Sequence, residues 1–449
     1  MTGSFGARRI GRWEWAAHRP YTIATAILFI SQAFPPLFRR QTEWTDIFVT
    51  ASQDLLAGRD FLAKQDNYYV YPPFFTMICT PFTLLPQALS QFIFYVVSCA
   101  CIVYVVRSAW ALSGGGRLEG AGAEVQPKEH LVFLLALFCA GRFLLNALSH
   151  LQTDLLVAAL VMAGCMALRA NRSFVAASWI GLATAMKCTP VLFAPYLAWR
   201  GKWLAALWLV TLAVGVNFLP DLVNRPPSGG FWAVEWYTRY VVPLEQADSV
   251  PGTWHNSPTD NQSLAGAVRR VFTTSIKWSK KGVEVVKSNS TASPKVLRWI
   301  TFSLYAMVTI PSAFALWRRR RAADPRSRKP SPDALEFSII FLLMLLLSPN
   351  SSRGHFGIML LPALCVGRIA VSEHDRTAWA LFLLATFVSL ISYNTPFNIL
   401  HLATLWLGAT CFVAVLLLAG CILALPGSNA VPQQPPGVHS NNRQTRVAH

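Results

Sequence analysis

DIFVTASQDLLAGRDFLAKQDNYYVYPPF, residues 46–74, separates the first apolar run of the chain, 21–38, from all the later ones. Its first part, 46–58, places Ile47, Leu55 and Leu56 among polar residues and predicts a short amphipathic helix that stops at Gly58. The stretch then runs into 71–86, which is apolar but holds four prolines and predicts a re-entrant or interfacial segment. We therefore expect a membrane protein that is organised around a first outer loop, 39–86.

The composition of the whole chain agrees with this interpretation. Of its 449 residues 53% are hydrophobic and 13% are charged, and the mean hydropathy is +0.40. These values exclude an ordinary soluble protein of this size. We predict an all-α polytopic membrane protein with one integral domain, 1–425, and a disordered cytoplasmic tail, 426–449.

About twelve transmembrane helices are expected, since a crossing needs roughly 20 residues and apolar runs recur along the chain. The predicted spans are 21–38, 89–111, 130–147, 153–169, 173–187, 189–199, 203–219, 295–317, 334–348, 355–371, 376–393 and 399–425. The amino end is placed in the cytoplasm because arginines precede the first run and the short basic loops fall on the same side. The long segment 220–294 is assigned to the opposite side as a large outer loop, because long loops translocate largely regardless of charge.

The net charge and the cysteines suggest no further partner. The formal net charge of +18 is explained by basic residues at helix ends, so no nucleic acid is expected. The nine cysteines lie in or beside apolar runs without a CxxC pair, which predicts neither disulfides nor structural zinc.

Polar side chains gather on the predicted outer side, at the ends of apolar runs. They are Asp46, Gln152, Asp154, Lys187, Arg353 and His355. Ionisable groups at membrane depth are costly and often functional. Ordinary explanations exist as well, because Asp46 and Asp154 can cap helices and Lys187 can extend to the interface.

Aromatic residues crowd the large outer loop beside amides and carboxylates. They are Trp232, Trp236, Tyr237, Tyr240 and Trp254, with Asn256, Asp260, Asn261 and Gln262 nearby. Such residues form a belt at a membrane interface, and they equally suit a sugar, whose ring has an apolar face and a rim of hydroxyls.

Six stretches follow one another over the chain up to residue 371. They are DxxVxxxxxLLAGRDFL from Asp46, YVYPPF at 69–74, HLQTDLL at 150–156, ATAMKCTPVL at 183–192, NQSLAG at 261–266 and LLSPNSSRGHF at 346–356. In this order they resemble glycosyltransferase family 87, the polyprenyl-phosphate-sugar-dependent membrane enzymes of the C-type glycosyltransferase superfamily. The chain departs from the family pattern at Leu151 and at Thr153-Asp154, where many members carry a small residue and an asparagine, so the resemblance leaves the substrate open.

The resemblance implies an inverting transfer of a sugar, with mannose expected, from a polyprenyl-phosphate carrier to a lipid-linked or glycan acceptor. The reaction is expected on the outer face of a bacterial inner membrane. By this analogy Asp46 is the general base, although the residues alone do not distinguish it from Asp54, Asp60 or Asp66. One base and cationic groups suffice for a phosphate leaving group, and neither a cofactor nor a metal is expected.

The remaining residues of the expected site follow from the same analogy. Lys187, Arg353 and His355 are expected at the donor phosphate, and Tyr71, Gln152, Asp154, Asn261 and Gln262 at the sugar or the acceptor. The proline-rich segment 71–86 is expected to line a groove for the polyprenyl chain. Two other interpretations stay open: a pentosyl transferase, such as an arabinofuranosyl transferase, of the same family, and a transporter or flippase for lipid-linked sugars, which the lack of an internal repeat disfavours.

Overall fold

The structure is a computed structural model. It describes residues 19–39, 41–62, 69–119, 126–245, 259–279, 282–288, 292–318, 332–393 and 400–425. The predicted tail, 426–449, lies outside these residues, as do Asp66, Trp254 and Asn256.

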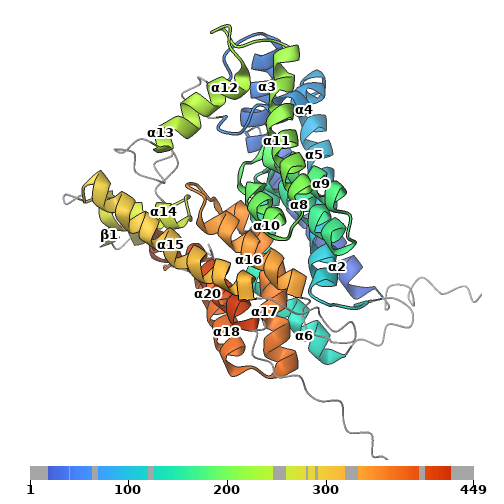
Figure 1. Cartoon of the computed structure of the whole chain (residues 1–449), viewed down its shortest axis with the longest axis vertical. Helices are drawn as coiled ribbons and strands as arrows, with labels where there is room; N and C mark the ends of the chain where they lie inside the picture. The colour runs from blue at the N-terminus through green and yellow to red at the C-terminus, as the bar shows by residue number, and fades with distance from the viewer. Residues whose placement is uncertain are drawn as a thin grey trace, which may run out of the picture.

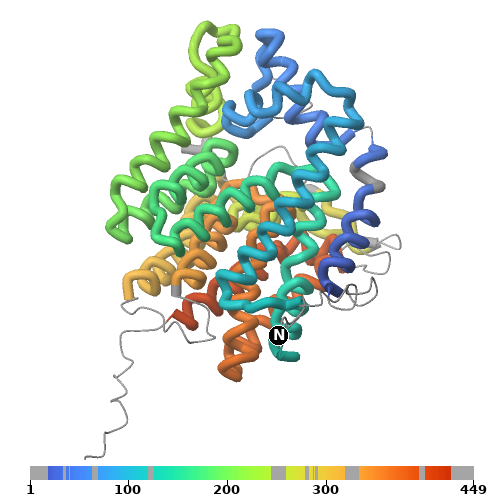
Figure 2. Tube along the Cα trace, turned by 90° about the vertical axis from the view of Figure 1, so that its right-hand side faces the viewer, coloured from blue at the N-terminus to red at the C-terminus, as the bar shows by residue number. Residues whose placement is uncertain are grey.

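Apolar helices packed side by side make up most of the described chain (Figure 1). The longer ones are α2 (Pro20–Phe38), α5 (Gln87–Leu112), α6 (Pro127–Ala136) with η3 (Leu137–Gly141) and α7 (Arg142–Ser149), α8 (Asp154–Arg169), α9 (Ser173–Met186), α11 (Trp203–Gly215) with η5 (Val216–Leu222), α15 (Pro294–Arg318), α16 (Pro332–Leu346), α17 (Leu360–Glu373), α18 (Arg376–Ile391) and α20 (Ala409–Ala424). Figure 2 shows the amino-terminal α2 running beside the bundle, where it contacts α5 and α7. The prediction of a helical membrane protein is confirmed.

Five helices of the described chain are long and apolar enough to cross a membrane. They are Gln87–Leu112, Pro127–Ser149, Trp203–Leu222, Pro294–Arg318 and Arg353–Glu373, and five further apolar helices are shorter. The number of about twelve spans and their orientation stay predictions. The predicted span 189–199 is wrong as a full crossing, because η4 (Thr189–Leu192) and α10 (Phe193–Trp199) have only four and seven residues. Pro190 lies at the start of this short helical segment, a position that proline tolerates.

The first loop contains the predicted amphipathic helix, as η1 (Trp44–Val49) and α3 (Thr50–Leu56). Gly58 follows with φ of 64°, a conformation that glycine adopts without strain. The Trp44 ring stacks on Phe94 of α5 at 3.8 Å between centroids, and its indole N–H donates to Ser90 Oγ at 2.8 Å. These contacts fix the start of the loop on α5. The proline-rich segment folds into the short helices α4 (Phe74–Cys79) and η2 (Thr80–Leu84).

The large loop contains short helices and one two-stranded hairpin, which the sequence did not predict. Its helices are α12 (Trp232–Trp236), η6 (Tyr237–Val241), α13 (Val242–Glu245) and α14 (Leu264–Thr273). The antiparallel strands β1 (Thr274–Ser279) and β2 (Gly282–Lys287) come next, with Ile276 opposite Val285. The β-branched residues in both segments favour strands. Figure 1 shows α3, α4 and α12 together at one end of the helices.

Candidate active site

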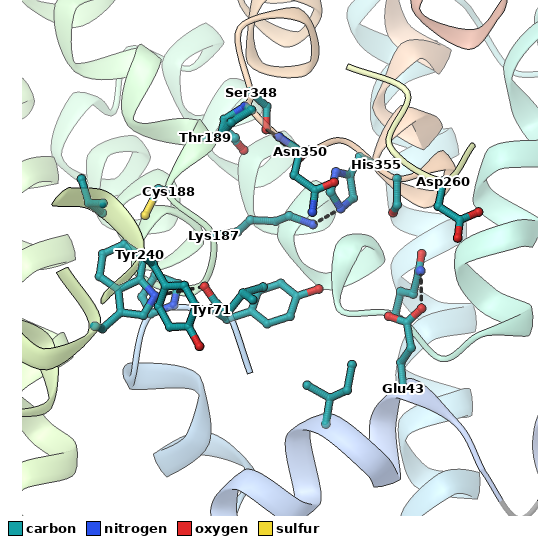
Figure 3. A pocket seen from close by; sticks show the side chains of 18 of the residues that line it. Glu43, Tyr71, Lys187, Cys188, Thr189, Tyr240, Asp260, Ser348, Asn350 and His355 are labelled. Carbon is teal, nitrogen blue, oxygen red and sulfur yellow. Dashed lines mark hydrogen bonds between the residues drawn. The ribbon is translucent and has the colours of Figure 1, made fainter. Parts of the chain in front are cut away.

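A cavity of about 810 Å³ lies where the loop segments meet the helices (Figure 3). Its walls come from six parts of the chain: the first loop, the end of α7 with the turn before α8, the end of α9, the segment around η6, Asp260 before α14, and the start of η7 (Arg353–Met359) with the loop before it. Because these parts are distant in the sequence, only the folded chain assembles the cavity.

Glu43 is the acidic residue that the first loop contributes to this cavity. It directly precedes η1, and the anchored Trp44 ring beside it holds the backbone in place. Gln152 Nε2 donates to Glu43 Oε1 at 2.7 Å (Figure 3). Gln152 itself sits in the turn between α7 and α8, where Leu151 is fully buried with φ of 52°. This conformation is uncommon for a residue other than glycine, so the position of Gln152 depends on packing around Leu151.

The pKa of the Glu43 carboxyl is raised above its usual value. Burial is the main cause and the charge of Asp154 adds to it, whereas the hydrogen bond from Gln152 and the charges of His150 and Lys187 lower the pKa. A carboxylate with a raised pKa accepts a proton more readily than one in water, which suits a general base.

Lys187 joins two other polar side chains on the opposite wall. Its Nζ lies 2.5 Å from Asp154 Oδ1 and also contacts His355 Nε2 (Figure 3). Asp154 is the first residue of α8, and His355 lies in η7. Lys187 follows the end of α9 with an extended backbone, which turns its side chain away from the helix axis.

The charges within this group largely cancel. Lys187 Nζ donates to Asp154 Oδ1 and contacts His355 Nε2, which itself lies 3.4 Å from the same Asp154 oxygen. Asp154 then balances the charge of Lys187. The group offers hydrogen bonds to a substrate but little net charge.

Buried polar atoms without partners face the same region. Gln152 Oε1, Asp154 Oδ2 and Asn350 Oδ1 have no hydrogen-bond partner among the described residues. Buried acceptors without partners are rare in proteins because each one costs free energy. These three oxygens are suited to accept hydrogen bonds from the hydroxyl groups of a bound sugar.

Aromatic rings form another part of the wall. Tyr71, Trp236 and Tyr240 line the cavity, and Lys187 Nζ lies 5.5 Å from the centre of the Tyr71 ring. The Trp236 indole N–H donates to the carbonyl of Val70 at 3.0 Å, which ties η6 to the first loop. Aromatic faces of this kind suit the apolar face of a sugar ring.

The structure brings most of the predicted site residues together and separates three from them. Tyr71, Gln152, Lys187, Arg353 and His355 line the cavity, and Asp154 contacts two of these residues. Besides Asp154, the predicted residues that do not line it are Asp46, Asn261 and Gln262.

Asp46 lies within η1, where its Oδ1 accepts a hydrogen bond from Thr45 Oγ1 at 3.1 Å. Its role as the base stays a prediction. Sequence reasoning missed Glu43, which lies on the cavity side. The sequence feature that could have pointed to Glu43 is its position as an acidic residue one helical turn before Asp46, close to the end of the first apolar run.

The side chains of Asn261 and Gln262 donate hydrogen bonds to backbone carbonyl groups. The Asn261 amide donates to the carbonyl of Pro349 at 2.9 Å, and the Gln262 amide donates to the carbonyls of Thr259 and Leu405 at 2.7 and 2.9 Å. Both side chains are buried, and their expected contact with the sugar or the acceptor stays a prediction. Asn261 joins the large loop to the loop before η7, and Gln262 joins it to α19 (His401–Trp406).

No group of three or more His, Cys, Asp and Glu side chains suited to a metal ion occurs among the residues that the structure describes.

Comparison with known proteins identifies the family. The sequence model of glycosyltransferase family 87 matches residues 69–349, which is more than half of the chain. No curated protein and no solved structure matches this protein. The apolar helices and the cavity with its acidic and basic side chains agree with the family match, and the protein belongs to glycosyltransferase family 87.

Proposed function

We propose that the protein transfers a sugar, with mannose as the expected one, from a polyprenyl-phosphate carrier to a lipid-linked or glycan acceptor on the outer face of the membrane. The family supplies the glycosyltransferase activity. The donor, the sugar and the side of the membrane belong to the proposal. The observation that supports it best is a half-buried carboxylate, Glu43, in a cavity that also contains basic groups and unpartnered oxygen atoms.

Glu43 is the base in this proposal. Its carboxylate takes the proton of the acceptor hydroxyl while the hydroxyl oxygen attacks the anomeric carbon of the sugar. The bond from that carbon to the phosphate oxygen breaks, and its electron pair leaves with the phosphate. A single displacement of this kind inverts the configuration at the anomeric carbon.

Neighbouring residues hold the reactants. The hydrogen bond from Gln152 keeps the Glu43 carboxylate in place, and Asp154 Oδ2 and Asn350 Oδ1 accept hydrogen bonds from sugar hydroxyls. Fixing a sugar and a base in reacting geometry lowers the entropic part of the barrier. No separate acid is needed, because the phosphate monoester anion that is released leaves readily once cationic groups compensate its charge.

A transfer assay tests the proposal and separates the two candidate bases. Purified protein in detergent is given mannose or arabinofuranose on a synthetic polyprenyl phosphate, together with a membrane extract that supplies acceptors. We expect transfer from the mannose donor, and Glu43→Gln should lower kcat by about 10² to 10⁴, the usual contribution of a general base. Asp46→Asn is the matched control and should keep most of the activity.

Each part of the proposal can fail separately. If the Asp46→Asn variant loses the activity and the Glu43→Gln variant keeps it, Asp46 is the base, as the sequence predicts. If arabinofuranose is transferred and mannose is not, the enzyme is a pentosyl transferase. Because no gradient exists in detergent, any transfer there excludes a protein that only transports lipid-linked sugars.

A further inference from the structure

Basic residues concentrate in one part of the large loop. Between 264 and 299 lysines and arginines recur, with Lys277, Lys287 and Lys295 among them, and Glu284 is the one acidic residue. The bias that places basic residues in short cytoplasmic loops does not account for them, because this loop is long and is assigned to the opposite side. The chain folds here into α14, the hairpin of β1 and β2, and the start of α15.

The hairpin has one apolar face and one polar face. Side chains alternate between the two faces of a strand, and the register places Trp278 opposite Val283 on the apolar face. On the polar face Lys277 lies opposite Glu284. Trp278 is 58% exposed, so the apolar face is open to the surroundings at this end of the hairpin.

Contacts at the base of the hairpin fix it relative to α14 and α15. α14 packs against both β1 and α15, and Figure 1 shows the hairpin beside α14 near one end of α15. The backbone N–H of Ser288 donates to the carbonyl of Thr273 at 3.0 Å, and the Trp406 indole N–H donates to Thr274 Oγ1 at 2.9 Å. Because these bonds close the base, the chain leaves the hairpin beside the end of α14 and enters α15 at Pro294.

α15 indicates the depth of the hairpin in the membrane. It is among the described helices that are long and apolar enough to cross, and only 22% of its most apolar stretch is buried within the protein. Trp299 near its start is 75% exposed and Trp317 near its end is 60% exposed. The helix between them rises about 27 Å, close to the roughly 30 Å of a hydrocarbon core. Because tryptophan is enriched at both membrane interfaces, the end of α15 that joins the hairpin lies at the level of the lipid headgroups.

We propose that the hairpin and the first two turns of α15 form a surface that binds anionic phospholipid headgroups. This hairpin surface consists of Lys277, Trp278, Lys295 and Trp299, which are all exposed. The two tryptophans reach toward the acyl chains, and the two lysines stay among the phosphate groups. Both residue types suit this layer because each combines an apolar part with a polar end.

A lipid surface fits this place better than a soluble partner does. The hairpin surface continues directly into the side of α15 that faces the membrane, where Met307 and Ile310 are also exposed. Its charge is complementary to an anionic headgroup, since basic residues near such a surface are attracted to it. An amphipathic element with tryptophan on one face and lysine on the other is typical of segments that lie in a membrane interface.

The hairpin surface is connected to the cavity through the start of α14. Ser263 caps this helix, and its Oγ accepts from the backbone N–H of Gly266 at 3.0 Å. Directly before it, the backbone N–H of Gln262 donates to the carbonyl of Ser351 at 2.7 Å, in the loop whose Asn350 lines the cavity. Lipid bound at the hairpin therefore holds this wall of the cavity at a fixed depth relative to the headgroups.

Lipid binding tests the proposal without any sugar transfer. The full-length protein in detergent is titrated with a fluorescent short-chain phosphatidylglycerol, which is then displaced by unlabelled phosphatidylglycerol or, in parallel, by phosphatidylcholine, which has no net charge. We expect phosphatidylglycerol to displace the probe at a much lower concentration. Lys277→Gln and Lys295→Gln should each weaken its binding about fivefold, the usual contribution of one basic residue near an anionic surface. Trp278→Ser should weaken it as well, because the exposed ring is lost.

Two further variants separate the hairpin surface from a general effect of charge. Lys128→Gln removes an exposed lysine from the first turn of α6 and should leave the affinity unchanged. Glu284→Gln removes the carboxylate opposite Lys277 and should strengthen the binding of phosphatidylglycerol several-fold. Because this variant gains affinity, damage to the fold cannot produce the expected result.

Equal displacement of the probe by the two lipids would overturn the proposal. So would an equal loss of affinity in Lys128→Gln and Lys277→Gln, which would indicate an attraction that depends on net charge alone. Tighter binding of soluble dextran sulfate than of phosphatidylglycerol would assign the surface to an anionic glycan instead. Normal lipid binding in a protein that transfers no sugar would refute the proposed function and leave this surface in place.

Discussion

The hydrogen bond between Gln152 and Glu43 should control the pH dependence of the enzyme. Gln152 Nε2 lies 2.7 Å from Glu43 Oε1, and this bond lowers the pKa of a carboxyl that burial raises. The Gln152→Leu variant keeps the size of the side chain but loses the donor. The pKa of Glu43 then rises further, so that at a given acidic pH a smaller fraction of the enzyme carries the ionised base.

The size of the effect follows from the type of bond. A hydrogen bond to a charged group contributes about 1.5–3 kcal/mol, and about 1.4 kcal/mol corresponds to a tenfold change in rate. On the acidic side of the pH profile, Gln152→Leu should therefore reduce kcat by about 10- to 100-fold. At high pH, where Glu43 is ionised in both proteins, most of the rate should return.

The measurement is kcat for sugar transfer as a function of pH, with the full-length protein in detergent. Gln53→Leu, an exposed glutamine on α3, is the control for the substitution itself and should leave the profile unchanged. An equal loss of rate at every pH in the Gln152→Leu variant would refute the reasoning, because it would mean that Gln152 has a structural role and does not act on the ionisation of Glu43.

Three further changes follow from the structure. In Gly354→Ala the new Cβ overlaps the amide oxygen of Gln152, so the acidic limb of the pH profile should move to higher pH, as in Gln152→Leu. Lys187→Met leaves Asp154 buried without its ammonium partner and should destabilise the protein by about 3–5 kcal/mol, measured by thermal unfolding in detergent. Arg368→Ala removes a guanidinium group that is 1% exposed. It should also cost about 3–5 kcal/mol of stability while leaving kcat per folded molecule unchanged.

Each of these changes has a control within the chain. Gly116→Ala should be silent, because nothing lies within 4 Å of a Cβ at that position. Adding Asp154→Asn to Lys187→Met should restore part of the stability, and if it lowers stability further the two charges do not compensate each other. The exposed Arg169, which bonds only the carbonyl of Ala111 at 2.7 Å, is the control for Arg368, and a similar loss from Arg169→Ala would contradict the role of burial.

Composition and spacing were enough to predict the class of fold and the amphipathic helix of the first loop. Both depend on local patterns: apolar runs, and a helix that ends at Gly58. The hairpin of β1 and β2 was missed because two short strands inside a long polar loop give little periodicity. The segment 189–199 was taken as a crossing from its apolar residues, although its length falls well below the roughly 20 residues that a crossing needs.

For the site, sequence reasoning found the residues at the ends of apolar runs but could not choose among neighbours in the first loop. Glu43 and Asp46 are three residues apart, and which of them faces the cavity depends on how Trp44 packs against α5. The family match begins at residue 69, so it does not decide between them. The sequence also could not show that Asp154 balances the charge of Lys187, because the pairing of these two residues depends on how α8 and α9 pack.

The distances along the sequence between the contacting residues have a consequence for how the enzyme matures in the membrane. Glu43 and Gln152 are 109 residues apart, and Lys187 and His355 are 168 apart. While the ribosome delivers the chain, Glu43 therefore lacks its hydrogen bond from Gln152 until the turn between α7 and α8 has been made. The basic groups that face it arrive later, with η7. A nascent chain that stops before residue 355 cannot close the site, so sugar transfer begins only after insertion is nearly complete.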